Sequence, residues 1–195
     1  MKVNGYDIKP NAYLVGACLA DANLAGANLV NARLANAWLA DAHLGNAWLV
    51  NANLTGAILV NAWLAGADLT GAKLVKANLT GANLVNANLA GAILPNFQIV
   101  PSEGSFIGWK KTTKGVVRLL ILEDSERTST LIGRKCRASK VKVLDGDGCG
   151  GTGTDYAQLT YEKGAIITSE YDDDIRVECT QGIHFFITKE EAMSW

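Results

Sequence analysis

The stretch ANLAGANLVN, residues 22–31, contains two copies of the five-residue unit that decides the fold of the first half of the chain. In this unit alanine stands first, leucine third, and glycine, asparagine or aspartate is the usual last residue. Leucine occupies every fifth position from Leu14 to Leu94, and alanine every fifth position from Ala12 to Ala92. Both series are unbroken, so one unit governs the whole segment.

A five-residue period fits neither a regular helix nor a flat strand. The leucines would be spread around a helix, which turns every ~3.6 residues, and would alternate between the two faces of a strand. The period instead predicts a chain that turns a corner after every unit and points its leucine and alanine inward. Glycine, asparagine and aspartate tolerate such corners. Successive coils would then stack and pair like parallel strands.

The copies Ala22–Gly26 and Ala67–Gly71 follow the pattern Ala-(Asp/Asn)-Leu-x-x, and residues 11–95 resemble the pentapeptide-repeat family. The resemblance implies a right-handed quadrilateral parallel β-helix, a solenoid of about four coils with about twenty residues in each coil. The side chains that precede the leucines would then form four vertical ladders on the outer walls.

The outward tryptophans and their neighbours in these ladders are candidate interface residues. One ladder contains Cys18, Trp38 and Ile58, while Trp48 and Trp63 fall in two others. Exposed apolar patches often mark contacts with another chain, so these outward side chains predict a protein partner or a homo-oligomer. The alternative is that these side chains only stack between coils and stabilise the solenoid.

Charge excludes several classes of partner. The chain has 18 Lys and Arg against 19 Asp and Glu, and residues 11–95 contain only three charged residues of each sign. This balance argues against a dedicated nucleic-acid or membrane-surface binder. The DNA mimicry found in some pentapeptide-repeat proteins needs a long acidic rod, which this neutral and short repeat does not supply.

Location and redox state follow from simple signals. The N-terminal residues do not read as a secretion signal, and no run of about 18 apolar residues predicts a membrane span. Four cysteines without a CxxC pair indicate reduced thiols. We therefore expect a soluble protein in the cytoplasm, or in the host cytoplasm if a phage encodes it.

Three segments are expected: an N-terminal cap at 1–10, the β-helix at 11–100 and a β-rich domain at 101–195. Apolar and β-branched runs predict strands, and the glycine-rich run Gly148–Gly153 predicts a flexible hairpin loop. A capping-box pattern from Thr188 to Glu191 predicts a short terminal helix. The predicted strands are Phe106–Lys110, Val116–Leu122, Val141–Leu144, Tyr156–Tyr161, Ala165–Thr168, Ile175–Cys179 and Ile183–Ile187.

The second domain also carries a resemblance. The segments Gly133–Ala138, Tyr161–Gly164 and Glu178–Thr188 resemble a domain of phage and bacterial proteins that often follows pentapeptide repeats. That family has no assigned activity, so the resemblance implies a phage or prophage origin and no mechanism.

A cluster of basic residues in this domain is a candidate anion site. Arg134, Lys135, Arg137 and Lys140 lie close together in the sequence, and such groups can hold a phosphate or a carboxylate. The acidic stretch at 170–174 is an alternative partner that would neutralise the cluster internally.

Cys136, Cys179 and His184 are the candidate reactive residues. An imidazole and nearby cations could activate a thiolate nucleophile, and with Cys149 the same residues could hold zinc. The simpler interpretation is that the cysteines are structural and buried in strands, and neither a metal nor a cofactor is expected.

These observations favour a non-enzymatic scaffold whose rigid solenoid presents the second domain for protein binding or oligomerisation. One alternative is a phage counter-defence protein that sequesters a nucleotide-like signal or blocks a host enzyme. The other is a cysteine-dependent enzyme in the second domain.

Overall fold

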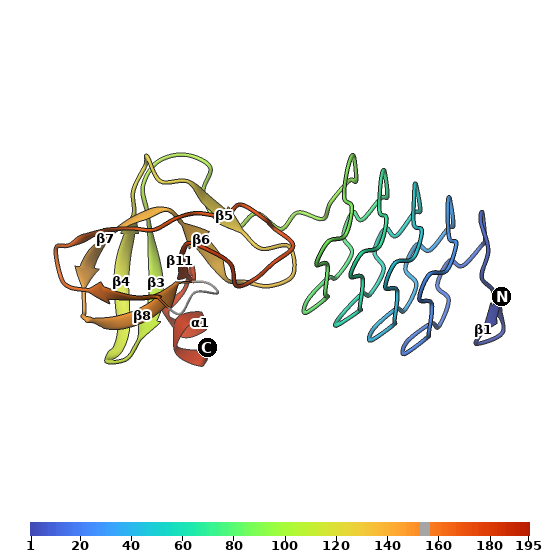
Figure 1. The fold of residues 1–195 in the computed structure, drawn as a ribbon, viewed down its shortest axis with the longest axis horizontal. Coiled ribbons are helices and arrows are strands. Elements are labelled where there is room, and N and C mark those ends of the chain that lie inside the picture. The colour runs from blue at the N-terminus through green and yellow to red at the C-terminus, as the bar shows by residue number, and fades with distance from the viewer. Residues whose placement is uncertain (153–156) are drawn as a thin grey trace. The chain divides into compact units, whose positions relative to one another are not determined.

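The computed structural model describes residues 1–152 and 157–195, which form two compact units of mainly β structure with little helix (Figure 1). The first unit comprises Met1–Phe97 with Leu131–Gly133, and the second comprises Gln98–Thr130 with Arg134–Trp195. Tyr156, the first residue of one predicted strand, and Gly153, the last of the glycine-rich run, lie outside the described residues.

In the first unit the chain winds with a spacing of twenty residues. Parallel bridges join residues twenty positions apart, as in Cys18, Trp38, Ile58 and Asn78, and confirm the predicted ladders. Each coil donates amide hydrogen bonds to the next, for example from Leu39 to the Ile58 carbonyl at 2.8 Å. The inward leucines and alanines from Leu14 to Ala87 are buried, because only the interior of the stacked coils removes them from water.

The last residue of each unit makes the corner. Every one of these residues from Asn11 to Gly91 has a positive φ, as the abundance of Gly, Asn and Asp predicted. The wall asparagines have a local reason too: the side chain of Asn53 accepts a hydrogen bond from the Thr55 amide at 3.1 Å, and Asn83 accepts one from Val85. Such bonds satisfy backbone donors next to the corner.

The N-terminal residues pack onto the first coil. Strands β1 (Lys2–Val3) and β2 (Tyr6–Asp7) form a hairpin, and the Cys18 amide donates to the hydroxyl of Tyr6. Ile8, which follows the hairpin, is buried. The hairpin therefore covers a coil end that would otherwise expose apolar side chains and strand groups.

The second unit is built from small antiparallel sheets and one short helix. Its largest sheet has the order β10-β7-β4-β3, a second has the order β11-β6-β5, and β8 pairs with β9. Phe186, the residue after β11, forms an antiparallel bridge with Trp109 of β3. The bounds are β3 (Phe106–Thr112), β4 (Gly115–Ile121), β5 (Arg127–Ser129), β6 (Cys136–Ala138), β7 (Lys140–Asp145), β8 (Gly148–Thr152), β9 (Ala157–Tyr161), β10 (Ile166–Thr168), β11 (Ile183–Phe185) and α1 (Lys189–Ser194).

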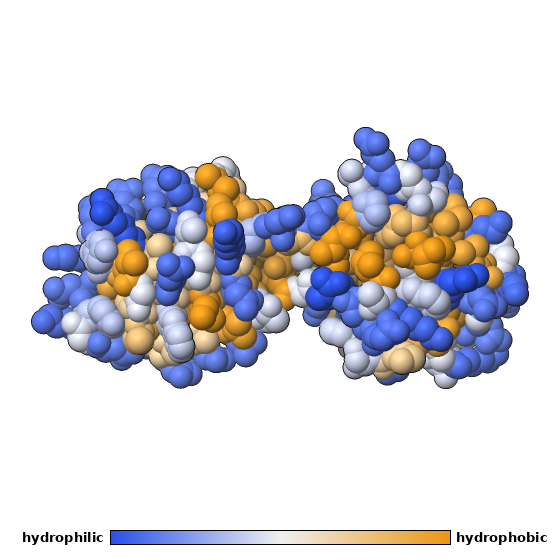
Figure 2. Space-filling view, turned by 180° about the vertical axis from the view of Figure 1, so that it is seen from behind, coloured by the Kyte–Doolittle hydropathy of each residue, from blue (hydrophilic) through white to orange (hydrophobic). Residues whose placement is uncertain are grey.

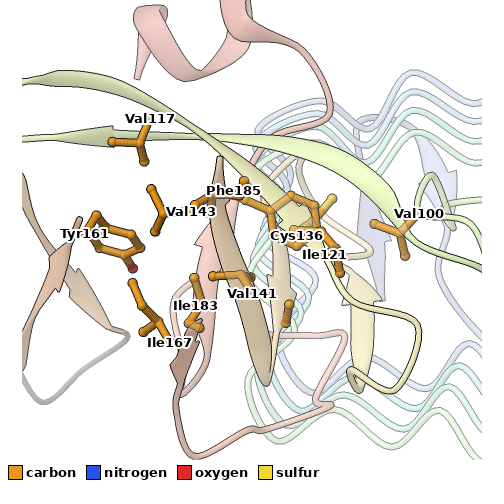
Figure 3. Close-up of a cluster of buried hydrophobic side chains, with 12 residues drawn as sticks. Val100, Val117, Ile121, Cys136, Val141, Val143, Tyr161, Ile167, Ile183 and Phe185 are labelled. Atoms are coloured by element: carbon orange, nitrogen blue, oxygen red, sulfur yellow. The ribbon is translucent and has the colours of Figure 1, made fainter. Parts of the chain in front are cut away.

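The core of this unit lies between the sheets (Figure 3). Inward residues alternate along β4, where Val117, Leu119 and Ile121 are buried, and Phe185 of β11 packs against them. Gly108 on β3 leaves the space that the Phe185 ring fills, since a Cβ there would lie 2.6 Å from that ring. Close packing of this kind fixes how the strands face each other.

Most predicted strands of the second unit are present with shifted ends, and the predicted terminal helix is confirmed. Thr188 caps α1 by accepting from the Glu191 amide, while the Glu191 carboxylate accepts from the Thr188 amide. The glycine-rich run was wrongly predicted as a loop for its described part, because Gly148–Thr152 pairs with β9. The strands β5 and β6, three residues each, were not predicted.

The predicted strand Ile175–Cys179 is wrong. The carbonyl groups of this region accept hydrogen bonds from the guanidinium of Arg137, which binds Asp172, Asp174 and Val177 through their main-chain oxygens. Because Arg137 gathers these carbonyls around one point, the segment curves and does not pair with a neighbouring strand.

Candidate functional site

A pocket of about 470 Å³ lies in the second unit. Strands β3, β8 and β11 contribute to its wall, together with the residue before β6, the loop before β11 and the aromatic residue after α1. Its polar side chains include Lys110, Lys135, Cys149, Cys179 and His184, and Trp195 forms an aromatic wall. No aspartate or glutamate among the described residues lines it.

Lys110 is buried on β3, where its side chain lies on the inward face. It pairs in register with the core residue Val117, and its Nζ donates to the carbonyls of Gly151 and His184 at 3.1 and 3.2 Å. Gly150 makes room for the chain, because a Cβ there would lie 2.7 Å from Lys110 Cε. Burial, together with the charge of Lys135, lowers the pKa of Lys110 to about 8.

Lys135 is also buried, with 4% of its surface exposed. Its Nζ donates to the Sγ atom of Cys179 at 3.1 Å and lies 3.5 Å from the centre of the Trp195 ring. The ring face attracts the ammonium group, so the Lys135 Nζ is held between an aromatic ring and a thiol.

His184 points into the same pocket from β11 as a neutral imidazole. Its Nε2 lies 2.8 Å from the Thr180 carbonyl, so Nε2 carries the proton and donates it there. Burial and the neighbouring lysines lower the pKa of His184 to about 3. The histidine therefore adds no positive charge to the pocket at neutral pH.

Cys136 lies apart from the other two reactive candidates. It is fully buried in the core of the second unit, with Sγ 3.8 Å from the Ser129 hydroxyl. Burial raises the pKa of its thiol to about 11, so the sulfur stays protonated and is a poor nucleophile. The structure thus brings Cys179 and His184 to one pocket and leaves Cys136 outside it.

The four basic candidates are likewise divided. Arg134 pairs with Glu191, Lys140 pairs with Asp124 at 2.6 Å, and Arg137 is occupied by main-chain carbonyls. Of the cluster only Lys135 lines the pocket. Its counterpart is Lys110, which lies 25 residues earlier in the sequence and was not among the predicted site residues.

Lys110 could have been found from the strand pattern. In the run Phe106–Lys110 it shares a face with Phe106 and Gly108, so a lysine is placed on the inward side of a predicted strand. A lysine at such a position is rare unless it has a specific partner or function. No sequence signal could have joined Lys110 with Lys135 and Trp195, because the tertiary fold alone brings them together.

The outward tryptophans of the first unit are exposed, as the ladder register predicted. Trp38, Trp48 and Trp63 have exposed fractions of 58%, 59% and 53%, and they belong to three different ladders. Ile58 is half-buried and Cys18 is exposed in the ladder of Trp38. Figure 2 shows apolar side chains among polar ones on the visible face of each unit.

Within residues 1–152 and 157–195, no group of three or more His, Cys, Asp or Glu side chains could hold a metal ion. None of the helices in this part of the chain is both long enough and apolar enough to span a membrane.

Comparison with known families explains the regular half of the chain. The family model for pentapeptide repeats matches residues 11–46, 39–74 and 62–96. This half belongs to the pentapeptide-repeat family. Residues 96–192 match a second model, described as a family of unknown function, DUF5758. No curated protein gives a significant match to the chain.

Solved pentapeptide-repeat proteins resemble part of this chain. Rfr23 from the cyanobacterium Cyanothece 51142 is 43% identical, with a TM-score of 0.42. A thylakoid lumen protein of Arabidopsis thaliana and HetL of Nostoc sp. strain PCC 7120, which is involved in heterocyst differentiation regulation, are each 31% identical, with TM-scores of 0.22 and 0.14. Each match covers 43% of this chain, which spans 56%, 67% and 58% of the three proteins in that order.

Proposed function

We propose that this pentapeptide-repeat protein is a binding protein whose second unit holds a small anionic ligand in the pocket of Lys110 and Lys135. The observation that carries the proposal is a pair of buried lysines with no acidic counter-ion among the described residues. Among the described residues neither lysine forms an ion pair. The charge of Lys135 lowers the pKa of Lys110, and both lysines lower the pKa of His184.

Two buried lysines without a counter-ion among the described residues favour an anion in this pocket. Electrostatic interactions are stronger there than in water, and burying a cation is costly unless an opposite charge is supplied. An incoming phosphate or carboxylate would supply that charge and relieve the repulsion between the lysines. The bound anion would therefore raise the pKa of Lys110.

The rest of the pocket fits a ligand with a flat or apolar part. Trp195 and Phe186 supply aromatic surface beside the lysines, and the volume of about 470 Å³ lies within the range of small-molecule sites. A nucleotide has both features, a phosphate and a stacking base. This combination supports the alternative in which the protein sequesters a nucleotide-like signal.

Titration of the full chain tests this proposal. Thermal shift and calorimetry at low salt would compare ATP, inorganic pyrophosphate and uncharged adenosine, using wild type, Lys110→Met, Lys135→Met and the exposed-strand control Lys142→Met. We expect ATP and pyrophosphate to stabilise wild type and Lys142→Met, and not the two pocket variants. Absence of stabilisation by either anion in the wild-type protein, or an equal effect in all variants, would overturn the proposal.

For the pentapeptide-repeat half we propose a right-handed quadrilateral β-helix of about four coils that acts as a rigid scaffold. The parallel bridges with a spacing of twenty residues support this geometry. The three exposed tryptophans support a second role in binding a protein partner or another copy of the chain. Light scattering of wild type and a Trp38→Ala, Trp48→Ala, Trp63→Ala variant tests self-association, which should weaken in the variant; a wild-type monomer would contradict the oligomer.

A further inference from the structure

The four cysteines of this chain occupy very different surroundings. Cys136 is buried and Cys18 is exposed on a wall of the repeat unit, whereas Cys149 and Cys179 line the pocket of the second unit. Of the two pocket thiols, Cys179 is the exposed one and accepts the hydrogen bond from the Lys135 Nζ. It is therefore both reachable and held next to a cation.

We propose that Cys179, whose sulfur accepts the hydrogen bond from Lys135, is a reactive thiol that forms covalent bonds with anionic electrophiles entering the pocket. This inference rests on the pocket of the proposed function and adds chemistry to it. The ligand class is a small molecule that carries both a negative charge and an electrophilic carbon.

Basic side chains lie around the Cys179 sulfur. Lys135 contacts it directly, Lys110 lies in the same pocket, and the exposed Lys111 is part of the wall. Nearby cations stabilise a thiolate and so activate a cysteine. The wall also contains the titratable Cys149 and the neutral His184, and no aspartate or glutamate among the described residues lines it.

The surroundings of Lys135 keep its ammonium group beside the Cys179 sulfur. Its ammonium lies against the Trp195 ring, and its side chain is buried, so it cannot swing freely into solvent. Cys179, in contrast, is exposed to solvent. Upon ionisation the thiol proton leaves to water, and the sulfur lone pair faces the pocket beside a fixed positive charge.

The bond-forming step is a simple displacement. The Cys179 sulfur donates an electron pair to the electrophilic carbon, an S–C bond forms, and the leaving group departs with the electrons of the broken bond. With iodoacetate as the probe, the products are carboxymethyl-Cys179 and iodide. The two lysines attract the carboxylate of the reagent and hold it near the sulfur.

Alkylation of the full-length protein tests the inference. Iodoacetate and its uncharged analogue iodoacetamide would be reacted in separate samples at neutral pH and low salt, with the rate at each cysteine followed by peptide mass spectrometry. We expect the rate ratio of iodoacetate to iodoacetamide to be about tenfold higher at Cys179 than at Cys18, since a cleft of one charge sign raises the encounter rate of oppositely charged molecules by about 10-fold or more. Equal ratios at the two cysteines would overturn the inference.

Variants separate the effect of charge from that of folding. Lys135→Met should lower both the rate and the ratio at Cys179, Lys135→Arg should retain most of the ratio, and the control Lys142→Met should change neither. Cys136 reports folding in every sample, because it reacts only when the second unit opens. A Lys135→Met protein with unreactive Cys136 and an unchanged Cys179 ratio would also overturn the inference.

The outcomes for binding and for reactivity are distinguishable. Cys179→Ser should still bind pyrophosphate if the lysines form an anion site, whatever the reactivity of the thiol. Pyrophosphate binding without selective alkylation would leave the proposed function and overturn the inference of a reactive Cys179. Selective alkylation of Cys179 without binding of any tested anion would support the reactive thiol and overturn the proposed anion-binding function.

Discussion

Lys76 occupies a corner of the pentapeptide-repeat half that its residue type does not favour. The corner residues from Asn11 to Gly91 all have positive φ, and all except Lys76 are Gly, Asn or Asp. Lys76 has a φ of 59° and an exposed side chain, and it forms no ion pair with the described residues. Replacing it with asparagine should therefore stabilise this unit.

The magnitude follows from the backbone conformation. A left-handed conformation costs an ordinary L-residue about 1–2 kcal/mol, and asparagine avoids part of this cost. Because the exposed Lys76 side chain forms no ion pair with the described residues, its removal should cost little. Lys76→Asn should therefore raise the free energy of unfolding by about 1 kcal/mol. For a unit of about 100 residues, Met1–Phe97 with Leu131–Gly133, that corresponds to an increase in its melting temperature of about 4–8 °C.

Calorimetry of the full chain, with the transition of the repeat unit followed by circular dichroism, measures this shift. The control Lys76→Ala removes the same charge but keeps an ordinary Cβ at positive φ, so its stability should match that of wild type. The reverse change, Asn86→Lys at a corner with a φ of 58°, should destabilise by a similar amount. If Lys76→Ala stabilises as much as Lys76→Asn, charge is the cause and the conformational reasoning is refuted.

Three further predictions concern the second unit. Pyrophosphate binding should weaken as pH rises from about 7 to about 9 in calorimetric titrations, because Lys110, with a pKa of about 8, loses its proton, and this step should be absent in Lys110→Met. The pKa of Lys110 is about 8 in the folded protein and 10.5 in the unfolded chain. Between these two pH values the unfolded chain binds more protons at this lysine than the folded protein does. The contribution of Lys110 to the free energy of unfolding therefore rises with pH over this interval. Arg137→Met should lower the free energy of unfolding by about 3 kcal/mol in denaturant titrations, because three main-chain carbonyls lose their donor, and a loss near zero would contradict their role. Tyr161→Phe should leave the melting temperature unchanged or raise stability by about 1 kcal/mol, since the buried Tyr161 hydroxyl has no hydrogen-bond partner among the described residues, and a clear loss would indicate one.

The candidate site was only partly predictable from the sequence. Cys179, His184 and Lys135 were identified by their residue types, and the structure brings these three to one pocket. Arg137 looked equally suitable for an anion, yet its guanidinium shapes the segment before Cys179 through three carbonyls. A basic residue that binds main chain and one that faces a ligand have the same appearance in a sequence.

The strands show the same division between local and distant causes. Alternation along Val116–Leu122 predicted β4 because its inward residues lie two positions apart. The short strands β5 and β6 carry too few residues for a pattern, and they exist because β6 is paired on both sides. The glycines of β8 suggested a loop, whereas one of them is needed to admit the Lys110 side chain.

By itself the sequence determined the repeat half, because its period repeats the same local decision: an inward leucine, an inward alanine and a residue that accepts positive φ. Twenty residues later the chain meets a copy of itself, so the register of the ladders follows without further information. Only the tertiary structure decided the pocket of the second unit. Lys110, Lys135, Cys179 and Trp195 come from distant parts of the chain, and their charges and ring interact only because sheet pairing and core packing bring them within a few ångströms.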